Sequence, residues 1–423
     1  MKRYVKAAIT HPLISGSLVV LAGSMGGNFF NFFYNLFMSR NLKLEDYGTL
    51  ISLSSLVILI SIPVGAVIPT VVNYAGTHFA NNDFDSVRAF FYKLIKPIVL
   101  ISLVILFLSI FFSSQLGSFF QIESRALIVL AGITVFFAYL GTVNSGLLQA
   151  KLAFKYLSVV QFLSLFLKFS AGAILVLLGF GVNGAMTAFL LSFIMPFVLG
   201  FIPLKFLIQK AVSNKKITNI KEISSYGISS AVVVFSLNSL VSTDILLVKH
   251  LFNPLDAGIY AGISLVGKVI FFLTAPISTV MFPLIVQKNA KKESYGGILR
   301  IAIFLVALSS LVVSVIYFLY PEEIIKLFLK RDDYLQAAPF LGFFGIFIAI
   351  YSVVSLLVYY FLSLKKTKIS IIMLSGAILQ AVFIYFYHNT FLDIILISTA
   401  VSIVLLLLLL LYYWQIRSKR KLW

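Results

Sequence analysis

The sequence contains no cysteine and only four histidines among its 423 residues. The lack of cysteine excludes disulfides and thiolate metal sites. The histidines at 11, 78, 250 and 388 occur singly, and their spacing builds no metal site. We therefore predict neither a metal nor a cofactor.

Charge is also scarce, because only 11% of the residues are charged whereas a soluble chain has about 25%. Hydrophobic residues make up 61%, and the mean hydropathy is +1.05. Lipid offers no partner for the backbone, so apolar runs of about 20 residues must be helices. The composition predicts an all-α integral membrane protein.

Apolar length and flanking charge predict about twelve transmembrane helices. The first run has no signal-peptide cleavage site and is expected to stay as a helix. The expected spans are 13–38, 48–73, 92–113, 125–149, 157–179, 184–208, 226–249, 258–285, 298–319, 336–363, 369–387 and 392–414.

The net charge of +19 follows the positive-inside rule. With the N-terminus inside, and with Lys and Arg near the end of a span counted with the adjoining segment, the inner segments carry 24, the outer loops carry 7 and the span interiors carry two. We predict that both termini are cytoplasmic. Nucleic-acid binding is the disfavoured explanation of this charge.

A basic stretch at 209–222 divides the chain into two equal halves. We expect an N-terminal lobe at 1–208, a cytoplasmic linker at 209–225 and a C-terminal lobe at 226–423. A weak repeat supports the division, since EDYGTLISLSSL at 45–56 resembles DAGIYAGISLVGK at 256–268. Gly48 and Gly258 coincide in this repeat. Two parallel six-helix halves are a transporter architecture.

Two longer stretches resemble a known family. SRNLKLEDYGTLISL follows the first span, and STDILLVKHLFNPLDAGIYAGISLVGKVIFFLTAPISTVMFPLI crosses the seventh and eighth. They look like the polysaccharide transporter branch of the multidrug/oligosaccharidyl-lipid/polysaccharide exporter superfamily, which includes Wzx-type flippases. The resemblance covers the whole chain in span count and loop lengths.

The resemblance implies a V-shaped, MATE-like fold of two lobes around a central cavity. It implies a flippase that moves a polyprenyl-diphosphate-linked oligosaccharide from the inner to the outer leaflet of the cell membrane. The resemblance implies that this transport serves the synthesis of O-antigen, lipopolysaccharide or capsule. Membrane lipids, a coupling H⁺ or Na⁺ and a polysaccharide polymerase are the expected partners.

Ionisable groups within spans are the default functional candidates, because each costs roughly 2.5–3.5 kcal/mol at a helix centre. Lys168 and Lys268 are both expected near the midplane. Lys168 shares a helical face with Gln161, and Lys268 shares one with Ser264. An ammonium from each lobe would offset the charge of a diphosphate. The alternative is that each lysine satisfies helix-end carbonyls or extends toward water.

Asp393 lies at the boundary of the last expected span, so Asp244 is the only acid well within one and is the candidate for ion coupling. It is expected near the outer end of its span, about 9 Å shallower than Lys268, which disfavours a direct ion pair. A purely structural role at the helix end is the alternative.

Asn28, Asn31 and Asn35 recur on one face of the first span and, with Gln161, are candidates for contacting sugar hydroxyls. Interhelical hydrogen bonds are the other interpretation. Interfacial belts or lipid-facing packing are expected for Tyr34, Tyr47 and Tyr260, and stacking platforms for sugars are the alternative.

Two other functions compete with flipping. The chain has no G-x-x-x-x-G-K-[ST], so it is not an ATPase. A cation-coupled drug antiporter of the same superfamily should carry buried acids in its first lobe, and this sequence has none there. A membrane polymerase or glycosyltransferase needs catalytic groups on a large outer loop, and the outer loops are short. We therefore do not expect an enzyme.

Overall fold

The computed structural model describes residues 12–42, 44–65, 67–120, 122, 124–207, 220–252, 254–329 and 332–419. This part of the chain does not include the expected linker residues 209–219 or the basic tails at 2–6 and 420–421. The described residues form helices and no strand, as the composition predicted. By their mutual packing they divide into two compact units, Met1–Gly227 and Ile228–Trp423.

Every expected span falls on helix. In the first unit these are α2 (Pro12–Asn41), α3 (Leu44–Gly65), α4 (Val67–Ala80), α5 (Phe84–Phe111), α7 (Arg125–Ala150), α8 (Phe154–Leu175) and α9 (Gly181–Gly200). A short α6 (Ser113–Phe120) follows α5, η1 (Val176–Phe180) joins α8 to α9, and η2 (Ile202–Leu207) follows α9.

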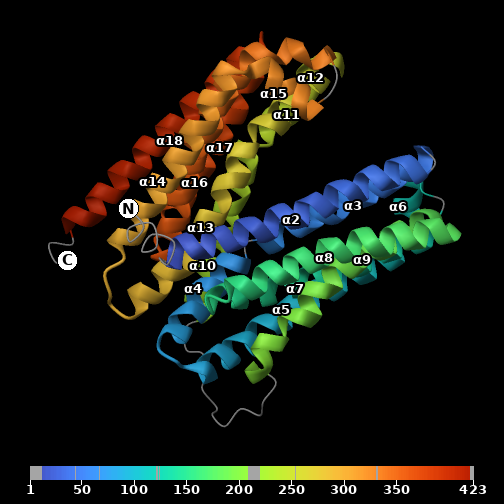
Figure 1. Cartoon of the computed structure of the whole chain (residues 1–423). Coiled ribbons are helices and arrows are strands. Elements are labelled where there is room, and N and C mark those ends of the chain that lie inside the picture. The colour runs from blue at the N-terminus through green and yellow to red at the C-terminus, as the bar shows by residue number, and fades with distance from the viewer. Residues whose placement is uncertain are drawn as a thin grey trace, which may run out of the picture. The chain divides into compact units, whose positions relative to one another are not determined.

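Helix α10 (Ile220–Leu240) begins in the first unit and continues into the second. The remaining helices of the second unit are α11 (Thr243–Leu251), α12 (Pro254–Gly267), α13 (Val269–Ala290), α14 (Gly296–Leu319), α15 (Pro321–Leu329), α16 (Ala338–Ser363), α17 (Ile369–Phe386) and α18 (Phe391–Lys419), with η3 (Asp332–Ala337) before α16. The loop expected at 321–337 therefore contains two short helical segments (Figure 1).

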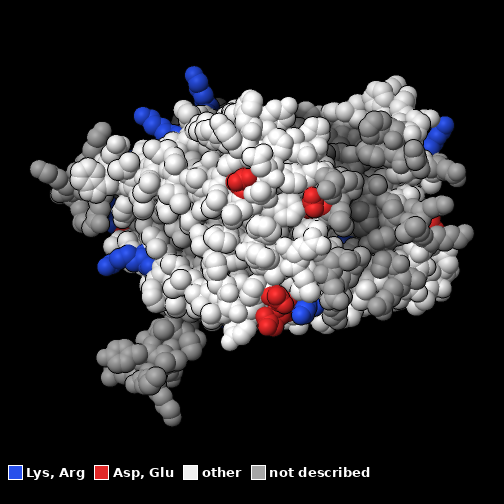
Figure 2. Space-filling model, turned by 90° about the horizontal axis from the view of Figure 1, so that it is seen from above, with Lys and Arg blue, Asp and Glu red and all other residues white. Residues whose placement is uncertain are grey.

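Ten helical stretches of the described chain are long and apolar enough to cross a membrane. One of them, Phe154–Gly200, holds both α8 and α9, which meet at Gly179 and Gly181 with φ of 89° and 50°. The expected second span is covered by α3 and α4, on either side of residue 66, which is not described. The face in Figure 2 is mostly uncharged, with most Lys and Arg toward its margins, as an exterior in lipid requires.

The two units share one packing scheme. The fourth long helix is central in each, because α7 packs on α3, α4, α5 and α9, while α16 packs on α12, α13, α14 and α18. The first and fifth helices also pair in each unit, α2 with α8 and α11 with α17. The weak sequence repeat thus corresponds to two similar helix arrangements.

Glycines on α2 allow its close approach to α8. A Cβ at Gly23 would lie 2.6 Å from Cβ of Ser158, and one at Gly27 would lie 2.8 Å from Cδ1 of Leu165. Small residues at such contacts are typical of packed membrane helices. The close pairing brings the polar side chains of α2 within reach of α8.

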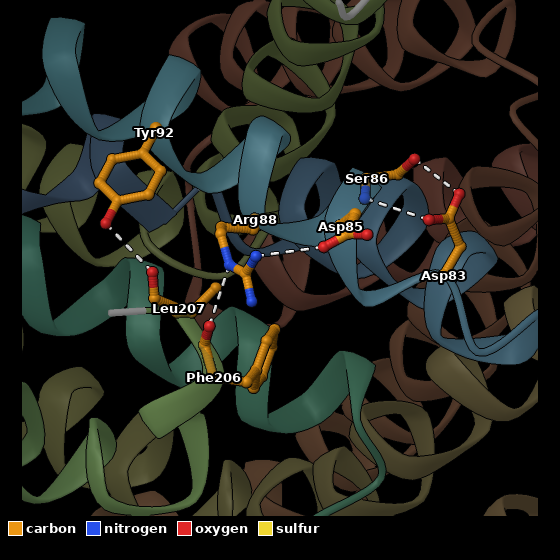
Figure 3. A network of polar contacts seen from close by, with 7 residues as sticks. All are labelled: Asp83, Asp85, Ser86, Arg88, Tyr92, Phe206 and Leu207. Atoms are coloured by element: carbon orange, nitrogen blue, oxygen red, sulfur yellow. Dashed lines mark hydrogen bonds and ion pairs between the residues drawn. The ribbon is translucent and has the colours of Figure 1, made fainter. Parts of the chain in front are cut away.

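A polar network joins α5 to η2 in the first unit (Figure 3). The buried Arg88 on α5 donates from Nε to the carbonyl oxygen of Phe206, at 3.0 Å, and pairs with Asp85 at 3.1 Å. The hydroxyl of Tyr92 donates to the carbonyl oxygen of Leu207, at 3.1 Å. These side chains give hydrogen-bond partners to backbone carbonyls of η2. The contacts join η2 to α5.

Candidate functional site

The first unit encloses Lys168 between three helices. Lys168 lies on α8, is only 6% exposed, and donates from Nζ to Oδ1 of Asn31 on α2, at 2.9 Å. Its ammonium lies 4.2 Å from the ring centre of Tyr34 and 4.6 Å from that of Phe189 on α9. The ring faces attract the cation, so the buried charge is stabilised without a carboxylate.

Tyr34 is itself fixed in this cage. Its side chain is buried, and its hydroxyl donates to the carbonyl oxygen of Ala185 on α9, at 2.9 Å. Gly172 on α8 leaves room for the ring, since a Cβ there would lie 2.8 Å from Cε2 of Tyr34. The expectation of an interfacial or lipid-facing Tyr34 was therefore wrong. A hydrogen-bonded carbonyl and a neighbouring cation offset the cost of burying the hydroxyl.

The other predicted amides of the first unit lie around this cage. Asn35 donates to the backbone oxygen of Asn31, at 2.9 Å, within α2. Gln161 is exposed and accepts from the hydroxyl of Ser24, at 3.5 Å, while Asn28 is also exposed. The structure thus brings Asn31 to Lys168 and leaves Asn28 and Gln161 with side chains open to the surroundings.

The second unit contains an interrupted helix where the first unit has a continuous one. Helix α10 ends at Leu240 and α11 begins at Thr243. The carbonyl oxygen of Leu240 accepts a hydrogen bond from Nε2 of Gln380 on α17, at 3.0 Å. The same nitrogen donates to the hydroxyl of Ser398 on α18, at 2.9 Å, and all three residues are fully buried. Such interruptions in membrane helices occur where irregular backbone is satisfied by protein.

Asp244 stands at the start of α11 and is completely buried. Its Oδ2 accepts from the hydroxyl of Tyr260 on α12, at 3.0 Å, and its Oδ1 has no hydrogen-bond partner. The position at a helix N-terminus favours a negative charge. Asp244 precedes the helix end at Leu251 by seven residues, about 10 Å along the axis.

Tyr260 is fully buried, so the expectation of a belt position was wrong for it too. Its ring packs against Phe344, with centres 6.1 Å apart, and against Phe391, with centres 5.6 Å apart. Aromatic burial together with a carboxylate acceptor explains its place in the core.

Lys268 follows Tyr260 by eight residues and lies at a bend between α12 and α13. The bend keeps the flanking backbone hydrogen bonds, Lys268 N to Ser264 O and Phe272 N to Lys268 O, both at 3.1 Å. Lys268 is half-buried. The hydroxyl of Ser264, between Tyr260 and Lys268 on the helix, is buried without a hydrogen-bond partner. The structure therefore groups two predicted site residues, Lys268 and Asp244, in one unit.

Four further residues belong to these sites although the sequence analysis assigned them no role there. Tyr34 and Phe189 surround Lys168, Tyr260 holds Asp244, and Gln380 fixes the interrupted helix. Gln380 is an isolated amide in the apolar run IIMLSGAILQAVFIYF, and this isolation could have marked it as a site residue from the sequence. A polar group in such a run must find a partner within the protein.

Known structures resemble this fold over nearly its whole length. An outward-facing multidrug resistance MATE family transporter of the MOP superfamily matches with a TM-score of 0.81 at 13% identity, covering 97% of this chain and 96% of that one. A MATE in complex with MaL6 matches with a TM-score of 0.80 at 13% identity, covering 96% and 97%. A MOP superfamily transporter from Pyrococcus furiosus Vc1 (DSM3638), described as having a binding pocket of reverse polarity, matches with a TM-score of 0.75 at 15% identity, covering 95% of both chains.

These likenesses establish the fold, and the sequence establishes the family. A search of the curated proteins gives no match. The family model described as "Polysaccharide biosynthesis protein" matches residues 17–339, about three quarters of the chain. That range includes both candidate lysines, the three candidate asparagines Asn28, Asn31 and Asn35, and Asp244. With its apolar helices, the chain is a multi-pass membrane protein with the fold of MOP superfamily transporters, and it belongs to the polysaccharide biosynthesis protein family.

Proposed function

We propose that this protein is a flippase that carries a polyprenyl-diphosphate-linked oligosaccharide across the cell membrane for surface polysaccharide synthesis. The match of residues 17–339 to the polysaccharide biosynthesis family supports the substrate class, and the transporter fold supports the activity. An anionic lipid of this kind needs positive charge within the membrane, and each unit supplies one lysine there.

Lys268 is the residue best placed to bind the diphosphate. Its neighbours on the same side of the helix, Leu265 and Phe272, are 62% and 55% exposed, so this side of the second unit is open. Ile58, which corresponds to Lys268 in the sequence repeat, is also 59% exposed. An ammonium on an open face can form a charge-assisted hydrogen bond with a phosphate oxygen.

In the first unit, the buried Lys168 donates to Asn31 and supplies positive charge next to it. The exposed amides of Asn28 and Gln161 would form hydrogen bonds with sugar hydroxyls. Asp244 is the candidate for binding a coupling H⁺ or Na⁺, because it is a buried acid with one unpartnered oxygen. A polysaccharide polymerase would be the partner that uses the translocated glycan.

We place both termini on the cytoplasmic side, from the distribution of Lys and Arg. Because the chain has no native cysteine, a cysteine at Asn389 should react with an impermeant thiol reagent added outside intact cells, while one at Asn81 should not. The reverse labelling pattern would contradict the orientation.

Translocation of the glycan lipid in proteoliposomes, with equal amounts of each variant, tests the proposed function. Lys268→Ala removes the charge-assisted partner of the diphosphate and should weaken its binding by about 1.5–3 kcal/mol, roughly ten- to hundredfold. Lys268→Arg keeps the charge and should retain part of the activity. Phe272→Ala is the matched control, since it opens the same face without removing charge.

Two outcomes would contradict the proposal. Wild-type rates for Lys268→Ala would exclude the cationic contact. Export of organic cations without any glycan-lipid translocation would favour a drug antiporter. This is the alternative function, because the chain shares its fold with MATE transporters.

A further inference from the structure

Asn31 offers only one end of its side-chain amide to a ligand. Its Oδ1 accepts a hydrogen bond from Nζ of Lys168, at 2.9 Å. Lys168 is 6% exposed, whereas the side chain of Asn31 is only half-buried. An ammonium donates and cannot accept, so the amide oxygen must face the lysine. The N–H₂ group is therefore the end of Asn31 that remains for a ligand.

The charge of Lys168 is not neutralised within the helices that enclose it. The rings of Tyr34 and Phe189 lie 4.2 Å and 4.6 Å from its ammonium. Helices α2, α8 and α9 contain no Asp or Glu. A hydrogen bond from a cation to an amide oxygen polarises the amide and strengthens its N–H groups as donors. The positive charge thus acts on the surroundings through Asn31.

A second amide lies along the same edge of the helix pair. The hydroxyl of Ser24 on α2 donates to Oε1 of Gln161 on α8, at 3.5 Å, and the side chain of Gln161 is exposed. On both helices this contact precedes that of Asn31 and Lys168 by seven residues, about 10 Å along the axis. In both contacts the amide oxygen is engaged, and the N–H₂ group remains for a ligand.

Asn35 adds an acceptor beside these donors. It follows Asn31 by one turn of α2, is half-buried, and donates from Nδ2 to the backbone oxygen of Asn31, at 2.9 Å. A backbone carbonyl accepts and cannot donate, so the side-chain oxygen of Asn35 is the end that remains. This edge of the first unit therefore combines N–H donors, a buried positive charge and one nearby oxygen acceptor. A sugar that carries a carboxylate next to a hydroxyl has the matching groups.

We propose that the first unit recognises a uronic acid within the transported oligosaccharide, and that Lys168 is the positioning residue that turns the N–H₂ group of Asn31 toward its carboxylate. A hydroxyl of the same sugar donates to Asn35, and Gln161 donates to an oxygen farther along the glycan. The buried ammonium favours the anionic sugar and disfavours an amino sugar, which is a cation. This inference rests on the proposed function, because it takes the amides of the first unit as sugar contacts.

Binding of three tetrasaccharides with the same linkage to the full chain in detergent tests the proposal. They are cellotetraose, its uronate, in which each primary alcohol is oxidised to a carboxylate, and the glucosamine tetramer. Mildly acidic buffer keeps the carboxylates ionised and the amines protonated. Isothermal titration calorimetry should show the uronate binding about tenfold more tightly than cellotetraose, and the glucosamine tetramer about fivefold more weakly.

Two variants separate recognition from structure. Asn31→Asp keeps an acceptor for Lys168 but removes the N–H₂ group, so the preference for the uronate over cellotetraose should fall to within about twofold. Lys168→Met fills the space between the two rings without a charge. It should also remove the preference while cellotetraose binds as in wild type. A purely structural lysine would instead change all three affinities by the same factor.

Matched controls keep these changes interpretable. Asn41→Asp introduces the same charge on α2, where the exposed amide donates to the carbonyl oxygen of Phe37, at 2.9 Å. It lies ten residues from Asn31, about 15 Å along the axis, and should preserve the order of the three sugars. Lys268→Ala in the second unit should preserve it too. Thermal unfolding of each variant confirms that equal amounts of folded protein are compared.

The outcomes separate this inference from the proposed function. Equal affinities for the three sugars in wild type, or no binding of any of them, would overturn uronate recognition and leave glycan-lipid translocation to be judged by its own assay. An order that survives Asn31→Asp but is lost in Lys268→Ala would place the anion in the second unit and overturn the inference. The expected order without glycan-lipid translocation would support uronate recognition and contradict the flippase.

Discussion

The two units use the same helix contact for different purposes. In each, the fifth long helix reaches the first through one polar side chain. Lys168 on α8 donates to Asn31 on α2, at 2.9 Å, and Gln380 on α17 donates to the carbonyl oxygen of Leu240 on α10, at 3.0 Å. These contacts join positions about 210 residues apart in the two halves, which is the separation of Gly48 and Gly258 in the sequence repeat.

The difference lies in what accepts the hydrogen bond. In the first unit the acceptor is a side-chain amide on an intact helix, and aromatic rings surround the lysine. In the second unit the acceptor is a backbone carbonyl at a helix interruption, which places the start of α11 and Asp244 in the core. The first unit therefore encloses a lysine between aromatic rings, and the second encloses a carboxylate at a helix start.

The largest effect that this comparison predicts is on stability, in the first unit. Lys168→Ala removes the donor to Asn31 and leaves a space between the rings of Tyr34 and Phe189. We expect a loss of about 2–4 kcal/mol in unfolding free energy, from the cavity and the lost cation–π contacts. Thermal unfolding in detergent measures it, with the exposed Lys155→Ala on the same helix as the control.

Lys268→Ala should lower the unfolding free energy much less than Lys168→Ala does, because the side chain of Lys268 is only half-buried. If Lys168→Ala unfolds like the control and yet abolishes translocation, Lys168 is a direct substrate ligand and the two lysines are functionally alike.

The next effect concerns the helix interruption in the second unit. Gln380→Leu leaves the buried carbonyl oxygen of Leu240 without a donor, which should cost about 1–3 kcal/mol of unfolding free energy. It should also change how translocation depends on the ion gradient, because the start of α11 carries Asp244. Ser398→Ala is the matched control, since it removes only the second acceptor of Gln380. Unchanged gradient dependence in Gln380→Leu would show that the interruption does not position Asp244.

The helices were predictable from the sequence because apolar length alone determines a membrane span. All twelve expected intervals overlap helices, and the junction of α8 and α9 near Gly179 lies at the expected end of the fifth. The helix ends were less predictable. Helix α5 begins at Phe84, eight residues before the expected span, because polar residues continue a helix outside the hydrophobic region.

The helix interruption had a signal that the sequence analysis did not use. Ser239, Ser242, Thr243 and Asp244 gather in the middle of an apolar segment, and such residues favour the start of a new helix. The cage around Lys168 had no such local signal. Tyr34 and Phe189 lie on helices far apart in sequence, and only the packing of α2, α8 and α9 brings them to the lysine.

The smallest effect distinguishes the two buried tyrosines. Tyr34→Phe removes the hydrogen bond to Ala185 but keeps the ring beside Lys168, so unfolding free energy should fall by only about 0.6–1 kcal/mol. Translocation per folded molecule should not change. Tyr260→Phe removes a hydrogen bond to a fully buried carboxylate, which is stronger than one between neutral groups, so unfolding free energy should fall by about 1.5–3 kcal/mol. Thermal unfolding of the two variants in detergent measures the difference. Equal losses would show that Tyr260 stabilises Asp244 in the second unit no more than Tyr34 stabilises the carbonyl of Ala185 in the first.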